Sequence, residues 1–349
     1  MISTLSKQFR TFAQNECRNS SPLYEYLAMQ IAEDEALLLI ASKRASGQPA
    51  PNLLFAAVHY LLMAHNDDEL ASFYPSLTTT PKPIDAVYPY FKKFVMTHAD
   101  ELTALLQERL VQTNEIKRCA YLYPMMAEIY HKHQRPLALI EIGASAGLQL
   151  AMDQYNYCYN DILSIHNSDS ALVLASQNTG DALPPSISHP FVVSQRIGID
   201  LNPLDVTNAN DVAWLQALIW PEHHERRTQL KKAIPIVKQL NVQHIQGDAI
   251  ERLTAISSQI EEESMLVVFH THVANQIPLH LRYQLIERLT EISLQRPLYH
   301  CYNNLFDGQL HQDFVQNGEI TSVRTIDQPD GHARWFKWVN ENKQIESNC

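Results

Sequence analysis

Glycine is scarce in this chain, at nine residues in 349, yet two of the nine, Gly143 and Gly147, lie within five positions of each other. Glycine adopts positive φ and allows close approach of a backbone or ligand, so this local concentration indicates a loop of special conformation. Paired cysteines are also lacking, because the five cysteines lie far apart and form no C-x-x-C pair. That pattern argues against a structural zinc site and suits a reducing cytoplasm.

Long apolar runs and an excess of positive charge are missing as well. No run approaches the roughly 18–20 residues of a membrane span, and the N-terminal stretch has no apolar core of a secretory signal. The formal charge of −11 disfavours general nucleic-acid binding, which uses a cationic surface. We therefore expect a cytoplasmic protein that acts on a small molecule, without membrane or nucleic-acid partners; the oligomeric state stays open.

Two regions of different character divide the sequence. Residues 1–135 carry apolar residues at helical spacing and show no strand alternation, which predicts a helical N-terminal subdomain. Over 136–349, strand-like apolar runs alternate with helical stretches, which predicts a parallel sheet covered by helices. Residues 156–190 interrupt this alternation and are interpreted as an inserted loop, or lid. The predicted parallel strands are 137–142, 196–199, 242–245, 266–269 and 298–302.

The most informative stretch is LALIEIGASAGLQL, residues 137–150. A buried strand, a small-residue loop and a helix start together present backbone N–H groups to a ligand. The dinucleotide motif G-x-G-x-x-G fails at two positions. The hydrolase elbow G-x-S-x-G is matched by Gly143, Ser145 and Gly147. The S-adenosylmethionine (SAM) loop of class I methyltransferases is matched by Glu141, Gly143 and Gly147, with Ser145 replacing the middle glycine; a tight turn without ligand is the remaining alternative.

The hydrolase interpretation lacks its structural context. An α/β-hydrolase places strands before its nucleophile, whereas helices are predicted before Ser145, and no HGGG-type oxyanion segment occurs upstream. No sequence motif identifies His332 and Asp307 as the histidine and the acid of a catalytic triad with Ser145. A serine hydrolase that uses Ser145 is therefore the weaker alternative.

Acidic residues follow successive predicted strands, at the sheet edge where ligands bind. Asp200 ends the second strand, where a carboxylate accepts ribose hydroxyls, and Asp205 is its rival for this role. Asp248 ends the third strand, beside the adenine amino group in methyltransferases; alternatively it caps the following helix. The predicted cofactor-binding residues are Glu141, Gly143, Ser145, Gly147, Asp200, Asn202, Asp248 and Ala249.

Histidines follow the fourth predicted strand, 266–269. His270 and His272 are expected to face the substrate, one of them as general base, with Glu222 in reserve. Residues i and i+2 of a strand share a face, so the two imidazoles could also meet a metal ion. No third ligand is identifiable, so we expect no metal.

Several blocks of the sequence resemble a known family. EIGASAGLQL, RIGIDLNPLDV, ALIWPE followed by Arg226–Arg227, IQGDA and VVFH are similar to signature blocks of the bacterial family catalogued as domain of unknown function 2332. The resemblance covers almost the whole chain and implies a methyltransferase-like fold, with little about substrate. It includes Asn114, Glu115 and Arg118, which form one polar face that is either solvated or lies over the SAM cleft.

The expected fold is an α/β, Rossmann-like class I methyltransferase sheet with a helical N-terminal cap. Segments 319–326 and 332–339, which flank a turn at 328–331, are expected to close the sheet as an antiparallel hairpin. The expected function is SAM-dependent methyl transfer to a small molecule or protein side chain. A non-catalytic SAM- or nucleotide-binding protein of the same fold is the alternative, favoured by the serine at position 145 and by the long insertion.

Overall fold

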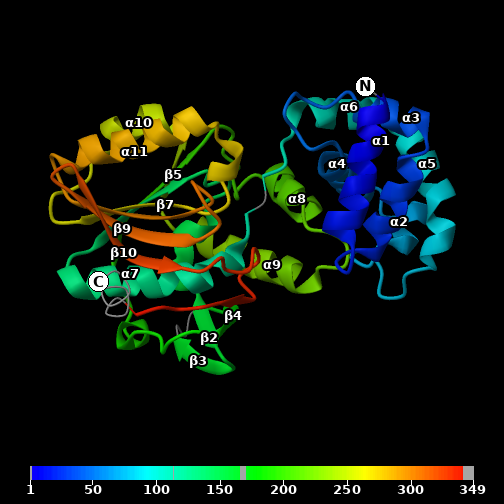
Figure 1. Cartoon of the computed structure of the whole chain (residues 1–349). Coiled ribbons are helices and arrows are strands. Elements are labelled where there is room, and N and C mark those ends of the chain that lie inside the picture. Colours follow the sequence, from blue (N-terminus) through cyan, green and yellow to red (C-terminus); the bar gives the residue numbers. More distant parts are fainter. Residues whose placement is uncertain (1, 113, 166–169, 341–349) are drawn as a thin grey trace. The chain divides into compact units, whose positions relative to one another are not determined.

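The computed structural model describes residues 2–112, 114–165 and 170–340 (Figure 1). It consists of two compact units: a helical unit, Met1–Thr113 with Thr207–Thr228, and a sheet unit, Asn114–Val206 with Gln229–Cys349. The sequence placed the boundary at residue 135. The difference arises because helix α7 (Cys119–His133) packs within the sheet unit, whereas α8 (Ala209–Ala217), from the middle of the chain, packs against α4 of the helical unit.

The helical unit is built around stacked aromatic side chains. Tyr24 and Phe55 stack with ring centroids 4.2 Å apart. Ser21 and Asp34 cap two of the helices by accepting backbone N–H groups, as expected for short polar side chains at helix starts. Besides α8, its helices are α1 Ile2–Phe12, α2 Pro22–Ile31, α3 Glu35–Ala41, α4 Ala50–Ala64, α5 Val87–Thr97 and α6 Ala99–Glu108, with shorter turns at Ala13–Cys17, Glu69–Phe73 and Ile84–Ala86.

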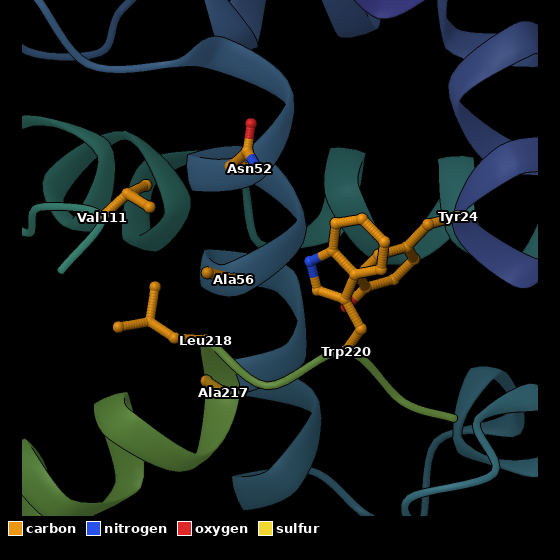
Figure 2. Close-up of a pocket in the computed structure, with 7 residues that line it drawn as sticks. All are labelled: Tyr24, Asn52, Ala56, Val111, Ala217, Leu218 and Trp220. Atoms are coloured by element: carbon orange, nitrogen blue, oxygen red, sulfur yellow. The ribbon is translucent and has the colours of Figure 1, made fainter. Parts of the chain in front are cut away.

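A cavity of about 30 Å³ lies in this unit beside Tyr24 and Trp220 (Figure 2). That volume holds about two water molecules, so the cavity is too small for a nucleoside-sized ligand. In the described ranges, no helix is both long enough and apolar enough to cross a membrane.

The sheet unit contains a seven-stranded sheet in the order β10-β9-β8-β7-β1-β5-β6. All five predicted parallel strands are present, and β9 and β10 are antiparallel. Numbered along the chain, the parallel strands lie in the order 3-2-1-4-5, so the sheet is doubly wound and its order reverses between β1 and β7. The strands are β1 Leu137–Ile142, β5 Val193–Asp200, β6 Val242–Gln246, β7 Met265–His270, β8 Leu298–Asn303, β9 Leu310–Gln316 and β10 Glu319–Ile326.

Helices cover both faces of this sheet. Helices α10 (Ala249–Ser257) and α11 (Leu279–Ser293) bury Leu253 and Leu289 against Ile140 and Val268 of the central strands. On the opposite face, His133 at the end of α7 lies 3.0 Å from the Tyr299 hydroxyl. Strands β1 and β7 are buried at every position, which explains why they appear in the sequence as apolar runs, whereas the edge strand β6, VQHIQ, is only partly buried. Helix α9 (His224–Lys238) crosses from the helical unit into the sheet unit.

Three predicted segments differ in the structure. The segment after β1 is a 3₁₀-helix, Leu148–Gln154, interrupted by non-helical Ala151, and not the expected α-helix. The expected inserted loop forms a second sheet, in the order β11-β4-β2-β3. The closing hairpin pairs β9 with β10, and the last strand joins the second sheet. The strands of that sheet are β2 Asn156–Tyr159, β3 Ile162–Ile165, β4 Val173–Asn178 and β11 Trp335–Phe336.

Candidate functional site

The loop after β1 adopts the positive φ angles that its composition indicated. φ is 70° at Gly143, 51° at Ser145 and 68° at Gly147. A Cβ at Gly143 would lie 2.5 Å from Val273 Cγ2, and one at Gly147 would lie 3.0 Å from His244 Cε1. The space beside both glycines is therefore filled by the protein's own side chains. Conformation and internal packing, and not only ligand approach, require glycine at these positions.

Asp200, at the end of β5, is bonded to this loop. Its Oδ2 accepts the Ser145 backbone N–H at 2.8 Å, and its Oδ1 accepts the Asn202 N–H at the same distance. Asp200 is thus the last residue of β5, and two backbone N–H groups orient its carboxylate, while its role as the ribose ligand stays a prediction. The rival Asp205 is exposed.

Two polar groups at the same sheet edge are buried without a hydrogen-bond partner among the described residues, Glu141 Oε2 and Ser145 Oγ. Burial raises the pKa of Glu141 well above its ordinary value, with a further increase from the Asp200 charge and an opposing effect of Arg118. Burial therefore favours the neutral carboxylic acid, a form that can donate a hydrogen bond.

Asp248 begins α10 as its N-cap, and Ala249 is the first residue of the helix. The Asp248 Oδ1 accepts the Ile250 N–H at 2.7 Å. The capping interpretation is confirmed, while contact with an adenine amino group stays a prediction, since a carboxylate has acceptor capacity for both.

The two histidines after the fourth predicted strand do not share a face. His270 is the last residue of β7, whereas His272 has φ 57°, so the strand alternation ends before it. His270 is 1% exposed, and its Nε2 lies 3.2 Å from the buried His300 Nε2. His272 donates its backbone N–H to Asn303, and its Nδ1 lies 3.1 Å from Asn304 Nδ2.

Burial determines the protonation of both rings. It lowers the pKa of His270 to about 3. It also lowers the pKa of His272 to about 4, with Arg118 and His332 contributing in the same direction. Both imidazoles are neutral at pH 7 and are weak bases. In the described part of the chain, His270 Nδ1 and His272 Nε2 are both buried without a hydrogen-bond partner. His270 is 1% exposed whereas the His272 residue is half-buried, so His272 is the better placed of the two to contact a substrate.

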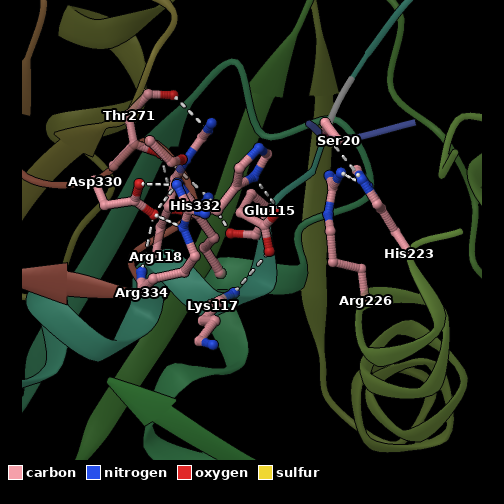
Figure 3. Close-up of polar contacts among 12 residues, drawn as sticks. Ser20, Glu115, Lys117, Arg118, His223, Arg226, Thr271, Asp330, His332 and Arg334 are labelled. Carbon is pink, nitrogen blue, oxygen red and sulfur yellow. Dashed lines mark hydrogen bonds and ion pairs between the residues drawn. The ribbon is translucent and has the colours of Figure 1, made fainter. Parts of the chain in front are cut away.

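The polar face that contains Glu115 and Arg118 is buried and not solvated. Glu115 is 2% exposed and Arg118 is 8% exposed. Figure 3 shows Glu115 directed toward His332, whose Nδ1 lies 2.9 Å from its Oε2. Arg118 donates its Nε–H to the Gly331 carbonyl at 3.0 Å, and its guanidinium lies 3.5 Å from the Thr271 carbonyl.

This polar face therefore belongs to the edge of the sheet at β7. Asn114 donates to the Ala144 carbonyl in the β1 loop at 2.9 Å. The Gln149 amide bonds both to the Glu115 carbonyl, at 3.3 Å, and to the Thr271 hydroxyl, at 3.2 Å. Sequence reasoning left this role open, and it missed Gln149 and Thr271, whose only signal was their nearness to the loop and to the strand end.

Glu222, the reserve base, belongs to the helical unit. Its carboxylate accepts the Ser21 hydroxyl at 2.7 Å and the Leu23 N–H at 3.0 Å, so it holds the start of α2. The neighbouring His223 contacts Ser20 and Arg226, also within that unit. A catalytic role for Glu222 stays a prediction.

Comparison with known proteins identifies a family but no activity. No curated protein and no solved structure matches the chain, so a methyltransferase assignment rests on geometry alone. The family model described as "Uncharacterized protein conserved in bacteria (DUF2332)" matches residues 6–338. That match spans nearly the whole sequence and includes the loop after β1, Asp200 and Asp248. The chain therefore belongs to the bacterial DUF2332 family.

Proposed function

We propose that the sheet unit binds SAM at the β1–β7 reversal and transfers its methyl group to a small molecule or a protein side chain. One observation carries this proposal. In a sheet of order 3-2-1-4-5, the adjacent strands β1, β5 and β6 carry Glu141, Asp200 and Asp248 at or just beyond their carboxyl ends, and the positive-φ loop follows β1. The crevice at such a reversal is where doubly wound sheets bind ligands.

Asp200 is suited to hold ribose hydroxyls. The backbone N–H groups of Ser145 and Asn202 fix the orientation of its carboxylate. A carboxylate has about four acceptor positions, so hydroxyls of a bound nucleoside would add to these two bonds. Glu141, whose neutral form burial favours, would donate a hydrogen bond at the neighbouring strand end.

Methyl transfer requires chiefly that the acceptor atom be aligned with the methyl group. SAM supplies that methyl group on a sulfonium centre. His272 Nε2, buried without a partner among the described residues, would receive a hydrogen bond from the acceptor group or donate one to it. Because the pKa of His272 is lowered to about 4, its role is orientation more than proton removal.

A non-catalytic SAM-binding protein is the second candidate. It is favoured by the burial of His270 against His300 and by the use of the Ser145 N–H within the protein. The serine hydrolase alternative gains nothing, since Ser145 Oγ has no hydrogen-bonded base among the described residues.

Calorimetric titration with SAM and S-adenosylhomocysteine tests the proposal. Asp200→Asn should weaken binding about 10- to 100-fold, the scale of a charge-assisted hydrogen bond. Asp205→Asn, which changes an exposed acid nearby, should bind like the wild type. Absence of binding by the folded wild-type protein would overturn both candidates. Release of S-adenosylhomocysteine upon addition of bacterial extract identifies the enzyme, and binding without release identifies the binder.

A further inference from the structure

The helical unit brings together three potential metal ligands that no part of the proposed function uses. His65, His98 and Glu101 each offer one ligand atom, and these atoms lie within 4.8 Å of one another. They come from three helix ends. His65 follows the last residue of α4, His98 lies between α5 and α6, and Glu101 is in the first turn of α6.

The backbone and an apolar contact hold the two imidazoles in place. His65 and His98 both lie outside helical geometry, with ψ of 51° and 26°, so each is the point where its helix ends. The two ring centroids are 4.7 Å apart. Both rings pack on Phe94, at 6.5 Å and 4.5 Å between centroids. This packing restricts the ring rotations that an ion would otherwise have to freeze, so the site is partly preorganised.

Glu101 completes the group from one helical turn beyond His98. Its Oε1 lies 2.8 Å from His98 Nδ1, and its side chain is 57% exposed. An exposed glutamate has rotamers available, so it can move from this hydrogen bond onto an ion.

We propose that His65, His98 and Glu101 bind Zn²⁺, with water at the fourth position. Two imidazoles and one carboxylate are a donor set that zinc accepts when a fourth position stays open. Ligand atoms around one zinc ion lie about 3.5 Å apart, so small side-chain rotations close the present spacing. The bound ion ties the end of α4 to the α5–α6 junction and thereby stabilises the helical unit.

The test is a calorimetric titration of the EDTA-treated full chain with ZnCl₂, together with thermal unfolding in its presence. We expect one Zn²⁺ per chain and a Tm that rises with zinc concentration, because the ion binds the folded state. Glu101→Gln replaces an exposed side chain and preserves folding; it should weaken zinc binding at least about tenfold. His98→Ala should abolish the zinc-dependent rise in Tm.

His280→Ala is the matched control, since it removes an exposed histidine of the sheet unit. It should leave zinc affinity and stoichiometry unchanged. Zinc binding that survives in both Glu101→Gln and His98→Ala, or no binding by the wild type, would overturn the proposal. These outcomes do not depend on SAM binding, so the zinc proposal can be rejected without rejecting the proposed function, and the reverse also holds.

Discussion

His332 Nδ1 lies 2.9 Å from Glu115 Oε2, across 217 positions of sequence. The glutamate side chain is 3% exposed and the imidazole is 46% exposed. The same C-terminal segment places the Gly331 carbonyl on Arg118. A polar face near residue 115 and a turn near residue 331 are therefore fastened together at the candidate site.

Removal of this pair should loosen the C-terminal segment without unfolding the protein. We expect His332→Ala to cost about 0.5–1 kcal/mol, because half of the pair is exposed to solvent. Hydrogen exchange over 328–334 should accelerate. A double-mutant cycle with Glu115→Gln measures the coupling free energy; strictly additive effects would show that the two side chains do not support each other.

Glu141→Gln should stabilise the protein at neutral pH. The folded-state pKa of Glu141 is raised above its value of 4.5 in the unfolded chain, so folding takes up a proton in the pH range between the two values. The wild type therefore loses stability as the pH rises from about 4.5 toward the folded-state pKa. Glutamine has no such dependence. Urea unfolding should give a higher midpoint for the variant at pH 7.5 and equal midpoints below pH 4; a lower midpoint for the variant at pH 7.5 would show that burial does not raise the pKa of Glu141.

Gly143→Ala should destabilise the sheet unit by about 1–3 kcal/mol, since the new Cβ meets both a positive φ and Val273. Gly47→Ala is the matched control, because φ there is 82° but no atom lies within 4 Å of the added Cβ. It should show only the conformational cost, about 1–2 kcal/mol. Val273→Ala should rescue Gly143→Ala in part. If Val273→Ala does not restore stability to Gly143→Ala, contact with Val273 is not the cause of the destabilisation.

Acid should destabilise the protein through its buried histidines. The folded-state pKa of His270 is about 3, against 6.5 for the unfolded chain. Below pH 6.5 the imidazole is therefore protonated in the unfolded state but not in the native state. The free energy of unfolding falls as the pH is lowered from 6.5 toward 3. At pH 5 this group alone accounts for about 2 kcal/mol. His270→Gln should reduce the change in urea midpoint between pH 7 and pH 5. If the variant shows the same change as the wild type, His270 is not held neutral in the native state.

The central strands β1 and β7 were predictable because they are buried at every position, which makes their sequences almost entirely apolar. Strand β9 was not. It reads LHQDFVQ, and its buried polar residues Gln312 and Asp313 break the apolar pattern. Gln312 pairs with Arg324 and Asp313 pairs with Tyr302, both on neighbouring strands, and a local sequence pattern does not predict such pairs.

The candidate site was predictable in part for a related reason. Asp200 and Gly143 lie at strand ends, which the apolar runs locate. Arg118 reaches the same sheet edge through the Gly331 and Thr271 carbonyls, backbone groups that have no sequence signature. The change from α- to 3₁₀-helix after Gly147 also depends on tertiary packing, since propensity alone favours an α-helix for LQLAM.

Strand β11 leaves the ribosome long after its partner β4. Phe336 accepts the Thr179 N–H across 157 positions, an interval of about 8–30 s of synthesis at ordinary elongation rates. Throughout that time the backbone groups at the edge of β4 have no partner strand and can pair with other strands. Glu115 and Arg118 also lack their contacts, because Gly331 and His332 have not yet been synthesised. A chain that ended before Gly331 would contain all seven strands of the main sheet, but it would lack β11 of the second sheet and the Gly331 and His332 contacts of the candidate site.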